Sequence, residues 1–184
     1  MNKELADKKW EKLLETIKGF QHIPFVDFVF VAGSMATGDI HQDSDFDVII
    51  GTRENRIFTV RQFSAGFFSL SGKRRTKEDS KKEAKDKLCL NHFVSPQAYK
   101  LDPPYNEYWV YLYQNLVPVY GRKKHIEEFL EVNDWAGKID LEYNRLIDKN
   151  DSFWKRFLEK LLSNKFGDLI EKIFRKYQLK RIKR

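Results

Sequence analysis

Two short stretches decide the fold: VAGSMATGD at residues 31–39 and SDFDVII at residues 44–50. The first stretch begins at the end of an apolar run over 26–32. This run is rich in β-branched and aromatic residues, which is typical of a buried strand. Gly33 and Ser34 interrupt this run, and a second apolar run over 46–50 closes at Gly51. We therefore predict two buried strands separated by a turn and a polar segment.

The second stretch carries two carboxylates, Asp45 and Asp47, at i and i+2. In a strand such residues point to the same face, about 6.5 Å apart along the chain. The two charges repel each other and favour a cation between them, and hard oxygen ligands suit Mg²⁺. Two such ions, about 3.5–4 Å apart, form the clamp used in phosphoryl and nucleotidyl transfer. The alternative is an ordinary solvated strand face.

The first stretch places Gly33 and Ser34 directly after a buried strand. Glycine lets the backbone approach a ligand closely. If a helix begins at Ser34, its free N–H groups and its hydroxyl face an anion such as a triphosphate. One turn then binds phosphate while the next strand holds metal. The alternative is a simple turn without a ligand.

Outward from these stretches, further elements follow from the pattern of apolar residues. Helical spacing predicts helices over 3–19, 55–70 and 105–116, and short apolar runs predict strands over 88–94 and 119–121. We expect Pro118 to stop the third helix. Residues 72–87 have almost no apolar side chain, which predicts a mobile charged loop.

Beyond Gly121 the pattern becomes helical, with apolar stripes over 153–162 and 166–177. The sequence therefore predicts an α/β (α+β) core over residues 1–122 and a helical, basic C-terminal extension over 123–184. Residues 155–184 hold eleven Lys and Arg against three Asp and Glu, a net charge of +8. This exceeds the net charge of +7 of the whole chain, so the basic character belongs to the extension. Such a tail favours RNA or a partner protein over an anionic membrane surface.

The amino-acid composition excludes several classes of protein. In 184 residues, 41% are hydrophobic and 15% aromatic, which excludes a disordered chain. A single cysteine, Cys89, excludes a disulfide framework and a cysteine-based zinc site, and favours a reducing compartment. We interpret Cys89 as a small buried apolar side chain. The sequence contains no run of about 18 apolar residues, the length that a helix needs to span a membrane. We therefore expect a cytoplasmic protein.

Taken together, the two stretches resemble the nucleotidyltransferase superfamily of the DNA polymerase β type. Its signature is an apolar residue, Gly, then Gly or Ser, roughly ten residues, and then Asp-apolar-Asp-apolar. The flanking residues resemble its small, minimal branch, and the resemblance covers about residues 25–121. It implies a mixed β-sheet flanked by helices, Mg²⁺ or Mn²⁺ on Asp45 and Asp47, and triphosphate β- and γ-phosphates on Gly33 and Ser34. An acceptor hydroxyl would attack the α-phosphorus, and pyrophosphate would leave.

The resemblance also implies a third carboxylate on a later strand, and the matching position falls nearest Asn91. Asparagine offers a neutral oxygen to a metal but cannot act as a base. His92 points to the opposite face, and Asp86 or Asp102 serves only if the alignment is shifted.

Two functions follow. The first is Mg²⁺-dependent transfer of a nucleoside monophosphate to a hydroxyl of an unidentified acceptor, which is a small molecule, an RNA or a protein. The alternative is a catalytically degenerate protein that binds nucleotide or RNA, or acts as an interaction protein of the toxin–antitoxin type.

Overall fold

The computed structural model describes residues 3–137, 139, 141–147 and 150–182, with the side chains of Asn91 and Ile182 outside that description. Its centre is a sheet of four strands in the order β3-β2-β1-β4. The strands are β1 (Val26–Val31), β2 (Phe46–Thr52), β3 (Leu88–Val94) and β4 (Val117–Gly121). Strand β1 pairs antiparallel with β2 and β4, whereas β2 pairs parallel with β3, so the sheet is mixed as the resemblance implies.

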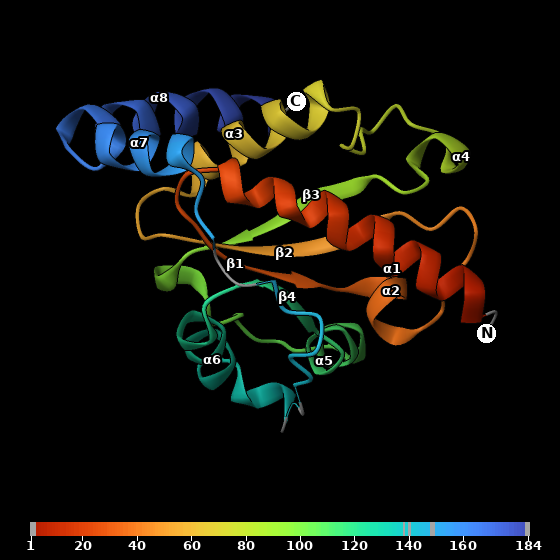
Figure 1. Ribbon diagram of the computed structural model, residues 1–184. Helices are drawn as coiled ribbons and strands as arrows, with labels where there is room; N and C mark the ends of the chain where they lie inside the picture. Colours follow the sequence, from red (N-terminus) through yellow and green to blue (C-terminus); the bar gives the residue numbers. More distant parts are fainter. Residues whose placement is uncertain (1–2, 138, 140, 148–149, 183–184) are drawn as a thin grey trace.

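Helices cover both faces of this sheet (Figure 1). Helices α1 (Lys3–Ile17), α3 (Ile57–Leu70) and α7 (Phe153–Leu162) lie on one side, and α5 (Glu107–Gln114) and α6 (Lys123–Glu131) lie on the other. The remaining helical segments are α2 (Gly33–Thr37), α4 (Lys81–Ala84), α8 (Lys165–Ile182) and the 3₁₀ turns η1 (Lys18–His22), η2 (Pro96–Ala98) and η3 (Asp134–Ala136). No described helix has the length and apolar character needed to cross a membrane.

The alternation of side chains along β1 fills two separate apolar clusters. Val29 and Val31 pack on the α1 and α3 side, and Phe28 and Phe30 pack on the α5 and α6 side. There the ring of Phe129 lies 5.4 Å, centroid to centroid, from both phenylalanines. All six residues of β1 are buried, because helices cover both faces.

Strand β4 begins two residues earlier than the sequence predicts and contains Pro118. Helix α5 ends at Gln114 and is thus already complete before the proline. Because β4 is an edge strand, a residue without an N–H group does not break the sheet there. The segment over 72–87 also differs from a plain loop, since it contains α4, whose N-terminus is closed by a capping box between Ser80 and Glu83.

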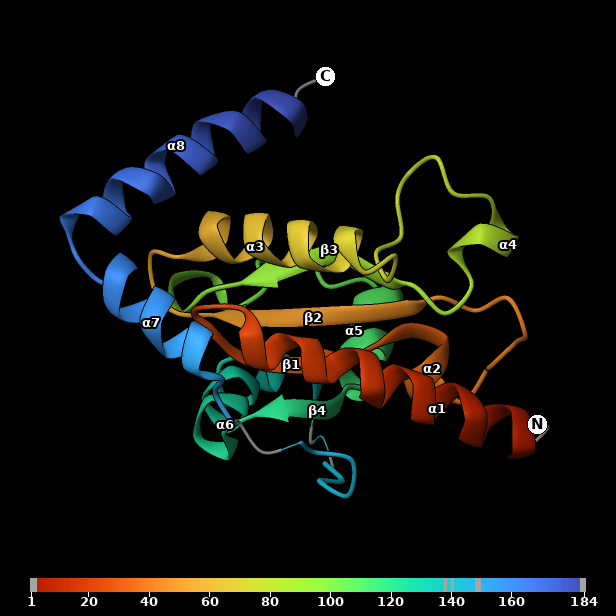
Figure 2. The same cartoon turned by 45° about the horizontal axis from the view of Figure 1, so that its top comes forward.

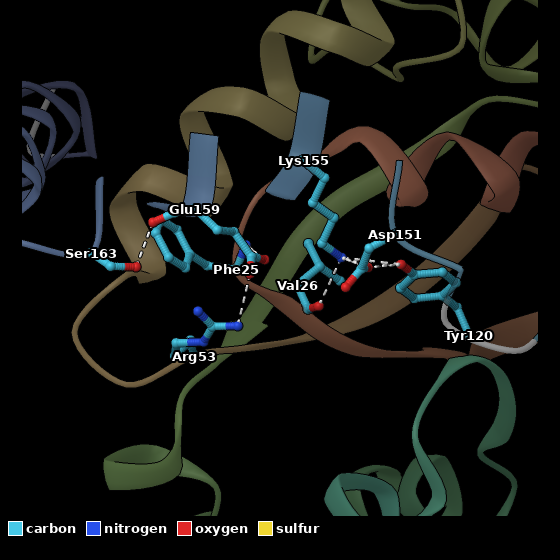
Figure 3. Close-up of polar contacts among 8 residues, drawn as sticks. All are labelled: Phe25, Val26, Arg53, Tyr120, Asp151, Lys155, Glu159 and Ser163. Carbon is cyan, nitrogen blue, oxygen red and sulfur yellow. Dashed lines mark hydrogen bonds and ion pairs between the residues drawn. The ribbon is translucent and has the colours of Figure 1, made fainter. Parts of the chain in front are cut away.

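Helix α7 is anchored to the core by polar contacts (Figure 3). The ammonium of Lys155 on α7 is fully buried and lies 2.8 Å from Asp151, 3.1 Å from the Tyr120 hydroxyl and 3.3 Å from the Val26 carbonyl. Glu159 on the same helix pairs with Arg53 at 3.0 Å. These contacts tie α7 to both β1 and β4.

Helix α8 runs beside α3 (Figure 2). The carboxylate of Glu171 on α8 accepts hydrogen bonds from the Phe58 and Thr59 N–H groups, at 2.9 and 2.8 Å, and so caps the N-terminus of α3. The division at residue 122 stays a prediction. Across it, Ile126 and Phe129 of α6 are fully buried in the core.

Candidate active site

The candidate site lies where β1 ends and β2 begins. Because these strands are antiparallel, Val31 at the end of β1 faces Val48 near the start of β2, and the Ala32 N–H donates to the Asp47 carbonyl at 3.0 Å. The turn that starts at Gly33 is therefore held beside the carboxylates of β2. The two stretches that the sequence singles out meet at one end of the sheet.

Gly33 is required at this position for two reasons. Its φ is +63°, a left-handed conformation that favours glycine. A Cβ at this residue would lie 2.5 Å from Oδ2 of Asp47. The backbone of the turn is thus packed directly against one of the two carboxylates, whereas its close approach to a ligand stays a prediction.

The turn leads into α2, which begins at Gly33, one residue before the predicted start at Ser34. Ser34 is half-buried, and no described side chain caps the N-terminus of this short helix. Gly38 ends the helix with a φ of +82°. The first N–H groups of α2 therefore lie next to Asp47 without a side-chain acceptor of their own.

Asp45 and Asp47 lie together, as their i, i+2 spacing predicts, although Asp45 precedes the first residue of β2. A donor atom of each, together with the Cys89 thiol, lies within 4.8 Å of the others. Burial raises the pKa of Asp47, and the nearby charge of Asp45 raises it further, against a hydrogen bond from Cys89 and the charge of Arg75. A divalent cation bound to these carboxylates would offset both the burial of the Asp47 charge and its repulsion by Asp45.

Cys89 is the member of this cluster that sequence reasoning assigned only to the core. It is buried as predicted, but the parallel pairing of β2 with β3 sets it opposite Asp47. Burial and the neighbouring Asp47 raise the pKa of its thiol to about 12. Two carboxylates and a thiol are a donor set for a divalent ion, in which the oxygens suit Mg²⁺ or Mn²⁺ and the sulfur suits softer ions.

The backbone of Asn91 lies in β3, and its side chain lies outside the described residues. The pairing is irregular at this point: Asp47 faces Cys89 and Ile49 faces His92, so β3 has one more residue than β2 in this interval. The ring of His92 contacts Trp109 on the α5 side, at 6.0 Å between centroids.

Neither of the other two acids considered for the third position joins the described cluster. Asp86 pairs with Lys9 and Lys12, at 2.8 and 2.7 Å, and Asp102 is exposed before α5. On β3 itself, Cys89 lies in the described cluster, and a ligand role for Asn91 stays a prediction.

Arg75 adds a basic side chain to the site. Nη1 of Arg75, from the charged segment after α3, lies 2.5 Å from Oδ2 of Asp45. The hydrogen bond and the charge of Asp45 raise the pKa of Arg75. The sequence places Arg75 only within the charged segment over 72–87, because its partner Asp45 is 30 residues away.

Comparison with known families shows to which family the chain belongs. The model of a family described as "nucleotidyltransferase domain" matches residues 10–182. The chain belongs to this family. The match covers nearly the whole chain and includes the Gly33 turn, both carboxylates and β3. Comparison with curated proteins gives no match. As a nucleotidyltransferase-family protein, the chain has a fold whose general activity is nucleotidyl transfer, with a nucleoside triphosphate as the donor.

Proposed function

We propose that this protein transfers a nucleoside monophosphate from a triphosphate to a hydroxyl group, with Asp45 and Asp47 holding Mg²⁺ or Mn²⁺. One observation carries the proposal: in a chain of the nucleotidyltransferase family, two carboxylates lie against a glycine turn whose first N–H groups have no side-chain cap. A bound divalent ion supplies charge stabilisation at the phosphorus and lowers the pKa of a coordinated hydroxyl.

The residues of the turn and of β2 divide the remaining work. The N–H groups after Gly33 and the Ser34 hydroxyl bind the β- and γ-phosphates. Asp45 and Asp47 would hold the divalent ion, which would supply positive charge to the phosphates. The acceptor oxygen forms a bond to the α-phosphorus, the bond from that phosphorus to the bridging oxygen breaks, and pyrophosphate leaves. The acceptor is a small molecule, an RNA or a protein.

The third position on β3 decides how fast this reaction runs. A carboxylate there would serve as a base, and general-base assistance is worth about 10²–10⁴-fold. Asn91 cannot accept a proton in this role, and the Cys89 thiol, whose pKa is about 12, stays protonated at neutral pH in the metal-free site. We therefore expect slow transfer, because neither side chain would remove the proton of the attacking hydroxyl.

The same observation favours the second candidate, a protein that binds nucleotide and transfers nothing. In that case the Gly33 turn and the two carboxylates retain a metal–triphosphate complex as a ligand. The two candidates share the binding site and differ only in turnover.

The outward surface of α7 and α8 supports a macromolecular partner in either case. The three acids of these helices each have a partner in the core: Glu159 binds Arg53, the exposed Asp168 binds Arg56, and Glu171 binds the start of α3. Apart from Asp168, the exposed charged side chains described on α7 and α8 are basic. Large apolar side chains lie exposed among them: Phe153, Trp154, Phe157, Leu161, Phe166, Leu169, Ile173 and Tyr177. We propose that this surface, the α7–α8 face, binds RNA or a partner protein.

The test of the transfer reaction is mass spectrometry of the protein incubated with each of the four triphosphates, Mg²⁺ and a cell extract. Transfer predicts an acceptor heavier by one nucleoside monophosphate together with free pyrophosphate, and both signals disappear when Asp45 and Asp47 are replaced by asparagine. Metal-dependent triphosphate binding without any product favours the binding protein. Absence of both binding and product contradicts both candidates.

A further inference from the structure

Arg75 and Asp45 form a contact that bears directly on the metal site. The guanidinium lies on Oδ2 of Asp45, and Asp45 is also one of the three donors of the cluster. The side chain of Arg75 is 41% exposed and that of Asp45 is 19% exposed, so the arginine covers the carboxylate from the solvent side. A cation that binds this oxygen must replace the guanidinium.

The backbone holds Arg75 in place beside the site. Its N–H donates to the Leu88 carbonyl at 2.9 Å, and the Leu88 N–H donates to the Lys73 carbonyl at 2.7 Å. These bonds add the segment 73–75 to the start of β3, one residue before Cys89. The backbone of Arg75 is therefore fixed while its long, half-exposed side chain is free to change partner.

Charge decides which partner it takes. In the metal-free site, Asp45 and Asp47 are the described carboxylates whose charge acts on Arg75. A divalent ion on Asp45 removes the attraction for Arg75 and adds a repulsion. A triphosphate that arrives with the ion brings several anionic oxygens, which guanidinium groups bind in charge-assisted, often bidentate hydrogen bonds.

We propose that Arg75 is a nucleotide-binding switch residue, which covers Asp45 in the empty site and pairs with the triphosphate when the metal–nucleotide complex is bound. This inference rests on the proposed function of the same site. It explains how two half-buried carboxylates are tolerated side by side before the ligand arrives. It also makes metal and nucleotide enter together, because the metal alone must displace the arginine without a new partner for it.

The switch predicts effects of opposite sign on two ligands. In Arg75→Gln, Mn²⁺ alone binds a few-fold tighter, because a competing ion pair of ordinary surface strength is removed. A non-hydrolysable triphosphate in saturating Mn²⁺ binds about tenfold weaker or more, because a hydrogen bond between charged groups is lost. Electron paramagnetic resonance of free Mn²⁺ measures the first affinity, and calorimetry measures the second.

Arg74→Gln is the matched control, since it removes the same charge one residue away from a side chain that contacts Ser69 rather than a carboxylate. Equal effects in the two variants, or weaker Mn²⁺ binding in Arg75→Gln, would overturn the switch. Unchanged triphosphate affinity in Arg75→Gln overturns it as well, while the proposed function stands. If the wild-type protein binds no triphosphate with Mn²⁺, the proposed function fails and the switch with it.

Discussion

At the scale of single residues, the thiol of Cys89 sets the chemistry of the cluster. It lies in the same cluster as the two carboxylates, and a hard cation such as Mg²⁺ prefers oxygen ligands. Sulfur is a poor ligand for Mg²⁺ and a good one for Cd²⁺ or Zn²⁺. The site of the wild-type protein is therefore expected to hold Mg²⁺ weakly without nucleotide.

Cys89→Asp is expected to tighten Mg²⁺ binding by at least about tenfold, since even residues that only orient metal ligands change affinity by about 10–100-fold. Calorimetry with MgCl₂ measures this. The wild type, but not the variant, should show the ultraviolet absorption of a thiolate–Cd²⁺ complex.

Asn91→Asp is the paired variant, two residues further along β3. If Asn91→Asp tightens Mg²⁺ binding and Cys89→Asp does not, the third ligand position is residue 91, as the resemblance implies. No change in either variant would contradict a third ligand position on β3.

What the sequence predicts at this scale is local. The pairing of Asp45 with Asp47 follows from an i, i+2 spacing, and the need for Gly33 follows from its place after a buried strand. The roles of Cys89 and Arg75 depend on the parallel register of β2 with β3 and on the bridge at Leu88. Both are tertiary pairings that no local pattern encodes.

At the scale of elements, an ion pair ties α1 to the chain before β3. The ammonium of Lys9 is 3% exposed and contacts Asp86 at 2.8 Å and the Ser44 carbonyl at 2.7 Å. Although burial alone would raise the pKa of Asp86, hydrogen bonds from Lys12 and Lys9 hold it below its usual value of 3.8. Asp86 thus has a structural partner on α1 and supports the segment that leads to Cys89.

Asp86→Ala is expected to lower the free energy of unfolding by about 3–5 kcal/mol at pH 7, because the buried ammonium loses its carboxylate. Because the pKa of Asp86 is lower in the folded protein than in the unfolded chain, the ionised carboxylate stabilises the fold at pH values above the unfolded-state pKa. This contribution is lost as the pH falls through the folded-state pKa. The difference between wild type and variant should therefore shrink below about pH 4, as measured by urea denaturation.

Glu4→Ala is the control, since Glu4 forms an exposed ion pair with Lys8 on the same helix and should cost no more than about 0.5 kcal/mol. A stability difference for Asp86→Ala that stays constant from pH 7 to pH 3 would contradict the ionic origin of the effect.

The elements themselves were largely predictable, because strands β1 to β3 are short apolar runs and the long helices have clear stripes. The exceptions have tertiary causes. Glu171 caps α3 from α8, more than 110 residues along the chain, so the sequence around Arg56 shows no capping residue. Pro118 lies in a strand because β4 is at the edge of the sheet.

At the scale of the whole molecule, charge is divided between a nearly neutral core and a basic tail. The sequence predicts this asymmetry by counting. It does not predict that Glu159, Asp168 and Glu171 all have partners in the core, because these partners lie on distant segments. This arrangement leaves the α7–α8 face more positive than the composition of the two helices implies.

Removal of residues 180–184 tests the α7–α8 face. The truncation deletes Lys180, Arg181, Lys183 and Arg184 at the end of the chain, so the melting temperature should change little. If the face binds RNA, affinity for a single-stranded RNA should fall, and the slope of log affinity against log salt should flatten by about 0.7–0.9 per lost phosphate contact. Fluorescence anisotropy at several salt concentrations measures both quantities.

The double variant Lys81→Gln, Lys82→Gln removes exposed charge from α4 instead and serves as the control. Equal RNA affinity in the full-length and truncated proteins would exclude this end of α8 as an RNA contact.

The Asp47→Asn variant tests whether Asp45 and Asp47 bind a nucleoside triphosphate through a divalent ion. Because burial and Asp45 raise the pKa of Asp47, its ionised form costs stability above that pKa, so the amide variant should melt no lower than the wild type at pH 7. The measurement is calorimetric titration of a non-hydrolysable triphosphate with and without Mg²⁺. We predict that Mg²⁺ strengthens binding to the wild type and has no such effect in Asp47→Asn. Equal strengthening by Mg²⁺ in a folded Asp47→Asn variant would contradict the account.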